Sequence, residues 1–277
     1  MSHLTKQASL PMYNQPEIRA AAQAWWKGIA KHMQQQGISD VPTGLTDTIP
    51  LDQLWKSEQL FFSQCCGLNV VRGYDKHLSV LMVTDWDAPG CEPYHYASHI
   101  VVHEDSPYKH INELKNTVAA INGPDSHSGM TTLMFEAHPF SENGHFFQAI
   151  RDSGSHVESL KLIQSKQADV AAIDCVTFAL LKRYRPAAID GIRIISRSQA
   201  APALPYVTAI STDLTTKQRM QTALTEAFAD PALTDVREAM LLKGCSFPDL
   251  TGSDNPYQAI ADGFKFDPRL MEVLIPA

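Results

Sequence analysis

A repeated order of segments most constrains the fold of this chain: a β-rich run ends, small polar residues follow, and a helix begins. The polar residues of the three clearest examples are Ser63-Gln64, Asp125-Ser126-His127-Ser128-Gly129 and Gly154-Ser155-His156. Alternating strands and helices are typical of α/β folds with mostly parallel sheets. Because open α/β sheets bind ligands beyond the carboxyl ends of their strands, these polar residues are candidates for a binding site.

Each of these polar clusters has the chemistry of an anion site. The first turn of a helix carries unpaired N–H groups and a partial positive charge. Serine hydroxyls add donors, and glycine lets the backbone approach a ligand closely, so such a cradle requires no Lys or Arg. Ser126 and Ser155 are equally suited to be ordinary N-caps, and the sequence leaves both interpretations open.

The apolar periodicity predicts individual elements along the chain. Strands are predicted at 9–12, 41–46, 59–62, 77–84, 97–103, 117–122, 147–151, 169–173 and 192–196, and again from Tyr206. Helices are predicted from Pro16 to Gly37, at 51–55, 111–114 and 130–137, from Val157, from Phe178 and at 232–243. Thr215 and Gln218 have the spacing of a capping box at the start of a further helix.

Length, composition and charge exclude several classes of protein. A chain of 277 residues forms one large domain or two of moderate size. With 44% apolar and 19% charged residues it has the composition of a globular protein, and its aliphatic runs, such as 80–83, are far too short for a membrane helix. Its 23 basic and 30 acidic residues leave a net charge of −7, so we expect no nucleic-acid partner.

The cysteine and histidine patterns indicate neither a disulfide framework nor a metal site. Five cysteines stand at 65, 66, 91, 175 and 245, an odd number without a C-x-x-C, so reduced thiols are expected. His95, His99 and His103 share one face of a strand, but no acid or cysteine completes a ligand set. Because nucleotide-binding and serine-elbow motifs are also missing, we expect no metal and no cofactor.

Several segments together resemble the phosphate, phosphite and phosphonate-binding proteins of ABC importers, which have the type II periplasmic-binding-protein fold. The matching stretches run in family order over most of residues 10–210. They are LPMYN (10–14), LFFSQCCG (60–67), YASHIVV (96–102), AAINGPDSHSGM (119–130), SGSHVESLKLIQSKQADVAAIDCVTFALL (153–181) and LPYVTA (204–209).

The resemblance implies an α/β fold with two lobes, each built on a mostly parallel sheet and joined by two hinge strands. Lobe one is expected to comprise residues 1–96 and 205–277, and lobe two residues 97–204. A ligand would bind in the cleft, on which the lobes would close.

The resemblance also implies which residues bind the ligand. The oxyanion would be held by Ser126, His127, Ser128 and Gly129, and the acid at Asp174 would accept a ligand proton or pair with a ligand amine. The aromatic residue after the first strand corresponds to Tyr13, and the polar turn of lobe one to Ser63 and Gln64. Tyr96 is a further candidate because it lies at an element end, and Ser155 and His156 because they form another polar cluster.

The function expected from this resemblance is capture of a small phosphate- or phosphonate-like oxyanion for an ABC importer, by a monomer that does no chemistry. Two alternatives stay open. One is a cytoplasmic ligand sensor, and the other is an enzyme on the same scaffold that uses His127, Cys66 or Cys175, as in the synthase of the thiamine pyrimidine precursor. The family role implies the periplasm, whereas the first ten residues lack the pattern of a signal peptide, which makes the cytoplasm the alternative.

Overall fold

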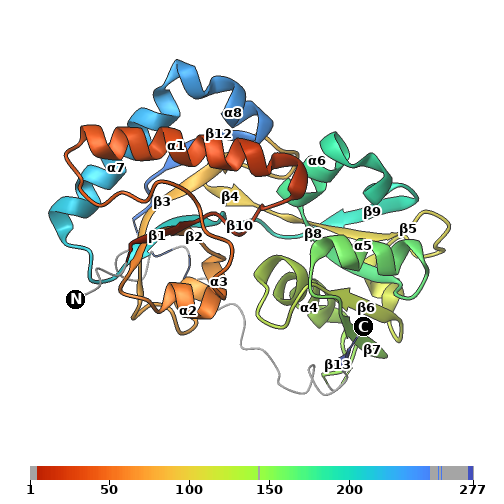
Figure 1. Ribbon diagram of the computed structural model, residues 1–277. Coiled ribbons are helices and arrows are strands. Elements are labelled where there is room, and N and C mark those ends of the chain that lie inside the picture. The colour runs from red at the N-terminus through yellow and green to blue at the C-terminus, as the bar shows by residue number, and fades with distance from the viewer. Residues whose placement is uncertain (1–4, 143, 250–254, 256, 258–273, 277) are drawn as a thin grey trace. The chain divides into compact units, whose positions relative to one another are not determined.

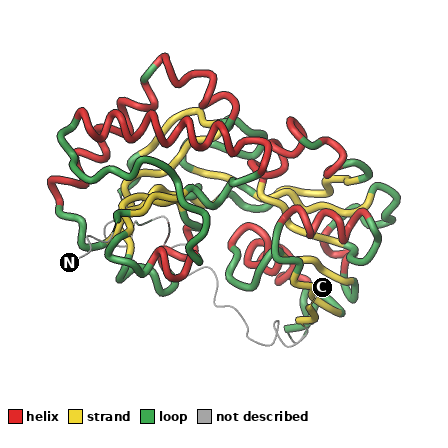
Figure 2. Tube along the Cα trace, in the orientation of Figure 1, coloured by secondary structure: helices red, strands yellow, loops and turns green. Residues whose placement is uncertain are grey.

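The computed structural model of the chain describes residues 5–142, 144–249, 255, 257 and 274–276. The chain divides into two compact units, Met1–Asp87 with Pro202–Gln258 and Ala88–Ala201 with Ala259–Ala277. The divisions after Asp87 and Ala201 differ by nine and three residues from the expected ones after Tyr96 and Leu204. Each unit has strands enclosed by helices, as Figure 2 shows.

The first unit contains a five-stranded sheet in the order β1-β2-β11-β3-β12 (Figure 1). Its strands are β1 (Gln7–Ser9), β2 (Leu60–Gln64), β3 (Leu78–Trp86), β11 (Pro205–Ala209) and β12 (Leu242–Ser246). Its helices are α1 (Arg19–Gln35), α2 (Leu51–Trp55), α3 (Gly67–Val71), α7 (Leu214–Ala229) and α8 (Thr234–Ala239), with 3-10 turns at Pro16–Ile18 and Pro231–Leu233.

Strand direction in this sheet brings three strand ends to one edge. β1 and β2 are parallel, whereas β11 is antiparallel to both β2 and β3. β1, β2 and β3 therefore run the same way, and their carboxyl ends meet at the same edge. The parallel pairing expected from sequence is present between β1 and β2, and the return strand β11 enters between β2 and β3 in the opposite sense.

The long helix α1 is held by two adjacent tryptophans. Trp25 and Trp26 are both fully buried. Trp25 Nε1 donates to the hydroxyl of Tyr206 on β11 (2.9 Å), and Trp26 Nε1 donates to the carbonyl of Pro42 (3.0 Å). The region 41–46 was predicted as a strand, which is wrong: Pro42 instead uses its carbonyl to bind this helix, and no ladder forms there.

Three further predictions in this unit are wrong in detail. The helix predicted at 232–243 ends at Ala239, because Leu241 has a φ of +59° and Leu242–Ser246 pairs with β3 as β12. The cap of α7 is Asp213, which accepts the N–H of Thr216 (2.9 Å), and not Thr215. The first strand lies at Gln7–Ser9 and not at 9–12, because it pairs with β2 in that register.

The second unit contains a six-stranded sheet in the order β13-β7-β6-β8-β5-β9, and a two-stranded sheet pairs β10 with β4. The strands are β4 (His95–Tyr96), β5 (Ser98–His103), β6 (Val118–Ile121), β7 (Ala149–Asp152), β8 (Val170–Asp174), β9 (Ile192–Arg197), β10 (Ala201–Pro202) and β13 (Leu274–Pro276). β13 pairs with β7, so the expectation that 205–277 lies wholly in the first lobe is corrected: this last strand extends the edge of the second sheet.

Helices cover both faces of this second sheet (Figure 1). They are α4 (Thr132–Ala137), α5 (His156–Gln164) and α6 (Cys175–Tyr184), with a π-helical turn at His127–Thr131 and 3-10 turns at Ile111–Leu114, His138–Phe140 and Pro186–Ile189. Alternate residues of β5 face opposite sides: Ile100 and Val102 pack with Leu133 of α4, and Val101 packs with Leu160 of α5. The strand alternation thus builds two cores from one strand.

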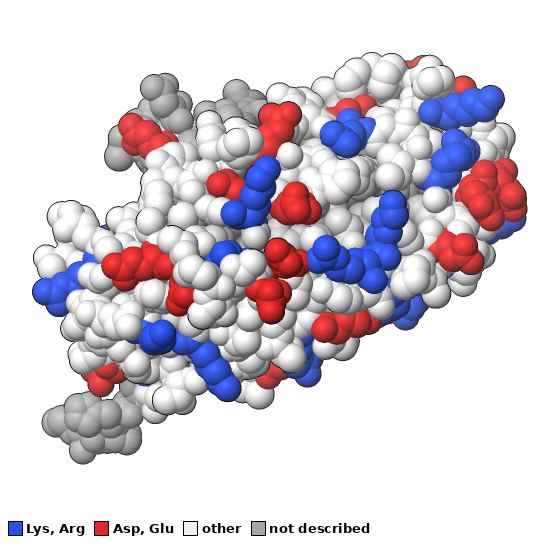
Figure 3. Space-filling model, turned by 90° about the horizontal axis from the view of Figure 1, so that it is seen from above, with Lys and Arg blue, Asp and Glu red and all other residues white. Residues whose placement is uncertain are grey.

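The surface charge and the length of the helices bear on two classes of protein that the composition argues against, nucleic-acid binders and proteins with membrane helices. On the face drawn in Figure 3, Lys and Arg lie among Asp and Glu and do not form a separate basic patch. None of the helices in the described ranges is long and apolar enough to span a membrane.

Candidate functional site

The polar residues of the second unit gather where three parallel strands end. β6 is parallel to both β7 and β8, with Ile121 opposite Asp152. The loop from Asn122 to Ser126 follows β6, Ser153 to Ser155 follow β7, and Asp174 ends β8. Topology therefore places two of the predicted polar clusters and Asp174 at one edge of one sheet, which is where α/β sheets bind ligands.

The clearest link between two of these clusters is a side-chain contact. Ser128 Oγ lies 3.0 Å from His156 Nε2, and the amide nitrogen of Asn122 lies 3.4 Å from the same ring nitrogen. Burial lowers the pKa of His156 to about 4. The imidazole is therefore neutral at pH 7. Its Nε2 either donates one hydrogen bond to Ser128 Oγ or accepts one from it.

The π-helical turn that carries Ser128 is held from both sides. Ser126 caps it by accepting the N–H of Gly129 (3.1 Å), and Ser98 of β5 donates to the carbonyl of Ser128 (2.8 Å). Gly129 leaves no room for a side chain, because a Cβ there would overlap Oδ1 of Asn122. The turn thus begins beside the two serines, and the first turn of a helix directs N–H groups towards its N-terminal end.

Ser155 and Asp174 are N-caps as well as candidate ligand residues. Ser155 accepts the N–H of Glu158 (3.2 Å) at the start of α5. Asp174 is 3% exposed and accepts the N–H of Thr177 (2.8 Å) at the start of α6. Capping occupies one acceptor position of each side chain, and each retains further capacity for a ligand.

Two buried rings of this unit lie next to each other. Tyr96 of β4 is 2% exposed, and its ring centroid lies 6.3 Å from that of His127. His127 is the first residue of the π-helical turn and is 5% exposed. Tyr96 therefore packs beside the turn that carries the serines.

In the first unit the candidate residues also follow parallel strands. Tyr13 follows β1, and its ring packs edge-on against Trp86 at the end of β3, with centroids 4.6 Å apart. Gln64 ends β2 and is 3% exposed. Gln64 Nε2 and Trp86 Nε1 are buried donors that find no acceptor among the residues the structure describes. Buried polar groups are nearly always hydrogen-bonded, so two such donors at one sheet edge are a sign of a binding surface.

Ser63 differs from its neighbour Gln64. Its hydroxyl accepts a hydrogen bond from Trp55 Nε1 (3.2 Å) and donates to the carbonyl of Gln64 (3.3 Å). Successive strand residues point to opposite faces of a sheet, so the side chains of Ser63 and Gln64 cannot both point towards one ligand. The hydroxyl of Ser63 serves the packing of α2.

Sequence reasoning missed two residues of these sites. Asn122 and Ser98 position the serine turn. A signal for Asn122 was present, since a polar residue directly follows the buried strand β6 and precedes Gly123. Ser98 carries no such signal, because a serine inside a β-rich run is more often part of the sheet alone.

Two of the residues considered for enzyme or metal chemistry have contacts that the structure defines. Cys175 lies against Cys91, with the two Sγ atoms 3.4 Å apart, and the ring of His127 lies beside that of Tyr96. His95 lies on β4, and His99 and His103 lie on β5. Within the described ranges no three His, Cys, Asp or Glu side chains form a group suited to a metal ion.

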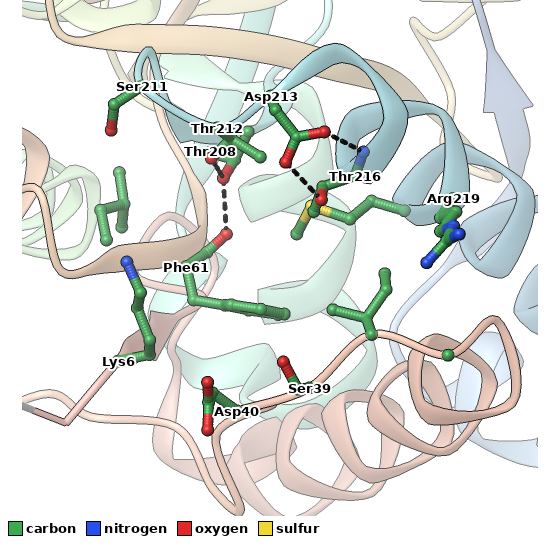
Figure 4. A pocket seen from close by; sticks show the side chains of 14 residues that line it. Lys6, Ser39, Asp40, Phe61, Thr208, Ser211, Thr212, Asp213, Thr216 and Arg219 are labelled. Carbon is green, nitrogen blue, oxygen red and sulfur yellow. Dashed lines mark hydrogen bonds between the residues drawn. The ribbon is translucent and has the colours of Figure 1, made fainter.

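A separate hollow lies in the first unit, away from the candidate residues (Figure 4). It has a volume of about 390 Å³, with Phe61 at its floor. Lys6 and Arg219 lie at opposite sides of the hollow, and Asp40 and Asp213 also line it. Two basic and two acidic residues leave its lining without net charge.

Comparisons with known proteins place this geometry in context. Residues 8–249 match the sequence model of a family described as "ABC transporter, phosphonate, periplasmic substrate-binding protein". A search of curated proteins found no match.

Several solved structures share the fold at low sequence identity. XAC2383 from Xanthomonas citri, bound to ATP, has a TM-score of 0.71 and 16% identity, over 94% of this chain and 97% of that one. PhnD1 from Prochlorococcus marinus, in complex with methylphosphonate, has a TM-score of 0.72 and 14% identity, over 93% of this chain and 96% of that one. A binding-protein component of an ABC phosphonate transporter from Pseudomonas aeruginosa has a TM-score of 0.67 and 14% identity, over 87% of this chain and 80% of that one. These likenesses confirm the two-lobed α/β fold.

Proposed function

Because the chain belongs to the periplasmic phosphonate substrate-binding proteins of ABC transporters, we propose that it captures a phosphonate-like oxyanion for an importer and releases it unchanged. The observation that carries the proposal is the contact of Ser128 with His156 at the carboxyl ends of β6 and β7. It joins two polar clusters into one binding surface.

In this proposal the serine turn holds the oxyanion. A first helical turn directs its N–H groups towards its N-terminal end, and here these belong to His127 and Ser128. Ser126 already accepts the N–H of Gly129, but a hydroxyl that accepts one hydrogen bond still has its own hydrogen to donate. Fixed N–H dipoles suit an anion here, because they need no reorganisation when it arrives.

His156 sets the direction of the hydrogen bond at Ser128. When the ring proton sits on Nε2, it donates to Ser128 Oγ, and the hydroxyl hydrogen is then free for a ligand oxygen. In the other tautomer Ser128 donates to the ring and offers the ligand only lone pairs. A fully ionised oxyanion needs donors, so it selects the first arrangement.

Asp174 gives the site its selectivity. Its carboxylate is buried at the end of β8 and accepts the N–H of Thr177. A carboxylate repels a fully ionised oxyanion but accepts a hydrogen bond from a protonated ligand oxygen or a ligand amine. Sulfate, which carries no proton at neutral pH, would donate no hydrogen bond to this carboxylate and would bind more weakly.

The first unit is proposed to contribute Gln64 and Tyr13 to ligand binding. The buried amide of Gln64 supplies an N–H donor, and the Tyr13 ring, braced by Trp86, supplies an apolar wall. We assign no ligand contact to Ser63, because its hydroxyl is engaged with Trp55 and a backbone carbonyl. The permease of an importer and a periplasmic location are proposed from family membership.

The test is calorimetric titration with methylphosphonate, phosphate, phosphite and sulfate. We expect saturable binding of at least one phosphorus oxyanion and much weaker binding of sulfate. Prolonged incubation followed by ³¹P NMR should return the ligand unchanged, whereas consumption of the ligand would favour an enzyme. Absence of binding to every phosphorus oxyanion, in protein whose mass spectrum shows no carried ligand, would refute the proposal.

A further inference from the structure

Two cysteines of the second unit that the binding site does not use lie in contact with each other. Cys91 Sγ is 3.4 Å from Cys175 Sγ, although 84 residues separate them in the chain. Cys175 is fully buried and is the first residue of α6, directly after Asp174. Cys91 is partly exposed, in the turn that follows Gly90.

The backbone around both sulfurs holds them in this position. Gly90 has a φ of +111°, and a Cβ on it would lie 3.1 Å from Cys175 Cβ, so the turn rests directly on Cys175. The N–H of Cys91 donates to the carbonyl of Ala88 (3.0 Å). Glu92 and His95 exchange two backbone hydrogen bonds and close the turn.

We propose that Cys91 and Cys175 form a reversible disulfide by exchange with a protein or low-molecular-weight disulfide. A disulfide has its sulfurs about 2.05 Å apart, so the two atoms must approach by roughly 1.4 Å. Rotation about the Cα–Cβ bonds and a small shift of the exposed turn supply such a movement.

The exchange balances without any further reactant. The partly exposed Cys91 loses its proton and attacks one sulfur of the oxidant, forming a mixed disulfide, and the other oxidant sulfur leaves as a thiolate that takes up that proton. Cys175 then loses its proton and attacks Cys91, forming the new bond and releasing the second oxidant sulfur as a thiol. The protein gives up two protons and two electrons, and the oxidant's disulfide becomes two thiols.

Two of the remaining cysteines are not placed for this reaction. Cys65 is fully buried, and burial raises the pKa of its thiol. Cys245 lies on β12 of the first unit. The pKa of Cys91 is raised too, by its contact with Cys175 and by burial, so exchange at neutral pH is expected to be slow and to accelerate at higher pH.

A disulfide here would tie the turn after Gly90 to the start of α6. It closes a long loop, which restricts the unfolded chain and raises stability. Family membership gives the proposal its setting, because periplasmic proteins meet an oxidising environment. The inference itself does not depend on ligand binding, so either proposal can fail without the other.

The experiment begins with reduced, native protein incubated with oxidised glutathione at pH 7 and pH 8.5. The protein is then quenched in acid, denatured and alkylated with N-ethylmaleimide, and its intact mass is measured. All five cysteines of the reduced chain react, and the oxidised chain should carry two fewer adducts. Peptide mapping should find Cys91 linked to Cys175, and Tm should rise by several degrees.

Matched variants make the outcome decisive. Cys245→Ser should still lose two thiols, whereas Cys91→Ser, a change at the more exposed partner, should lose none and show no rise in Tm. Cys175→Ser is the second arm, with circular dichroism as a check of its folding. Loss of two thiols in Cys91→Ser, or a wild-type chain that keeps all five thiols or only glutathione adducts at both pH values, would overturn the proposal.

Discussion

Ser128 Oγ lies 3.0 Å from His156 Nε2, so the turn after β6 and the first residue of α5 meet although 28 residues separate them. The contact exists because β6 and β7 are parallel and end at the same edge. A neutral histidine there controls the donor that the serine offers. Most of the expectations about binding chemistry rest on this pair.

Ser128→Ala is expected to weaken methylphosphonate binding by about 1–3 kcal/mol, roughly tenfold to a hundredfold, because the oxyanion loses a donor. Calorimetry gives the measurement. The matched control is Ser165→Ala, whose hydroxyl only donates to carbonyls at the end of α5. Equal affinities of Ser128→Ala and the wild type would remove the serine turn from the proposed site.

Gly129→Ala is expected to destabilise the chain by about 1–3 kcal/mol or more, because its Cβ would overlap Oδ1 of Asn122 in a buried turn. Urea unfolding measures the change. Gly44→Ala is the control, since a Cβ at Gly44 meets only the side-chain oxygen of Gln23 at 3.9 Å. If both variants unfold at the same urea concentration, Asn122 is not the constraint on this turn.

Acid should destabilise the protein through two imidazoles. Burial lowers the pKa of His99 and of His156 to about 4, from an ordinary value of 6.5. The unfolded chain binds more protons than the folded one between these values, so stability is complete above about pH 6.5 and falls as the pH drops towards 4. For the buried His99, a pKa shift of this size changes the free energy of unfolding by at most about 3 kcal/mol.

Urea midpoints measured from pH 7 to pH 4 check this expectation. In the wild type the His99 ring packs against Phe178 and must remain neutral there. His99→Gln removes this ring, so it should flatten the pH dependence of the urea midpoint. His138→Gln, at an exposed position, should leave the slope as it is. Parallel curves for His99→Gln and the wild type would show that another group controls acid unfolding.

Local sequence patterns predicted the elements whose neighbours are close in the chain. Apolar spacing in α1 and the β-branched residues of β5 identified these elements, because each buries a face that its own residues define. β12 was missed because pairing with β3, more than 150 residues away, overrides the helical pattern before Gly244. The Asp213 cap was missed because two neighbouring residues could begin that helix.

The candidate site was predictable to a similar degree. Serine and glycine after a strand indicated the turn at 126–129, and the structure shows that Ser126 is also its cap. The partnership of Ser128 with His156 depends on strand order, which periodicity does not contain. The role of Ser98 depends on the same order, since it reaches the turn from the separate strand β5.

Gln64→Leu is expected to change stability and binding in opposite directions. Its buried Nε2 has no acceptor among the described residues, so an apolar side chain of similar size should raise the unfolding free energy by about 1 kcal/mol. The same change removes a proposed donor and should weaken methylphosphonate binding at least tenfold. Urea unfolding without ligand and calorimetry with ligand measure the two effects separately.

The control for this pair of effects is Gln164→Leu, whose amide donates to the carbonyls of Ala187 and Asp190 (3.0 and 2.9 Å). That variant should lose stability and keep its affinity, because its hydrogen bonds are satisfied within the chain. A Gln64→Leu protein that is less stable than the wild type would mean that the amide serves packing. One that is more stable but binds methylphosphonate normally would exclude Gln64 from the ligand contacts.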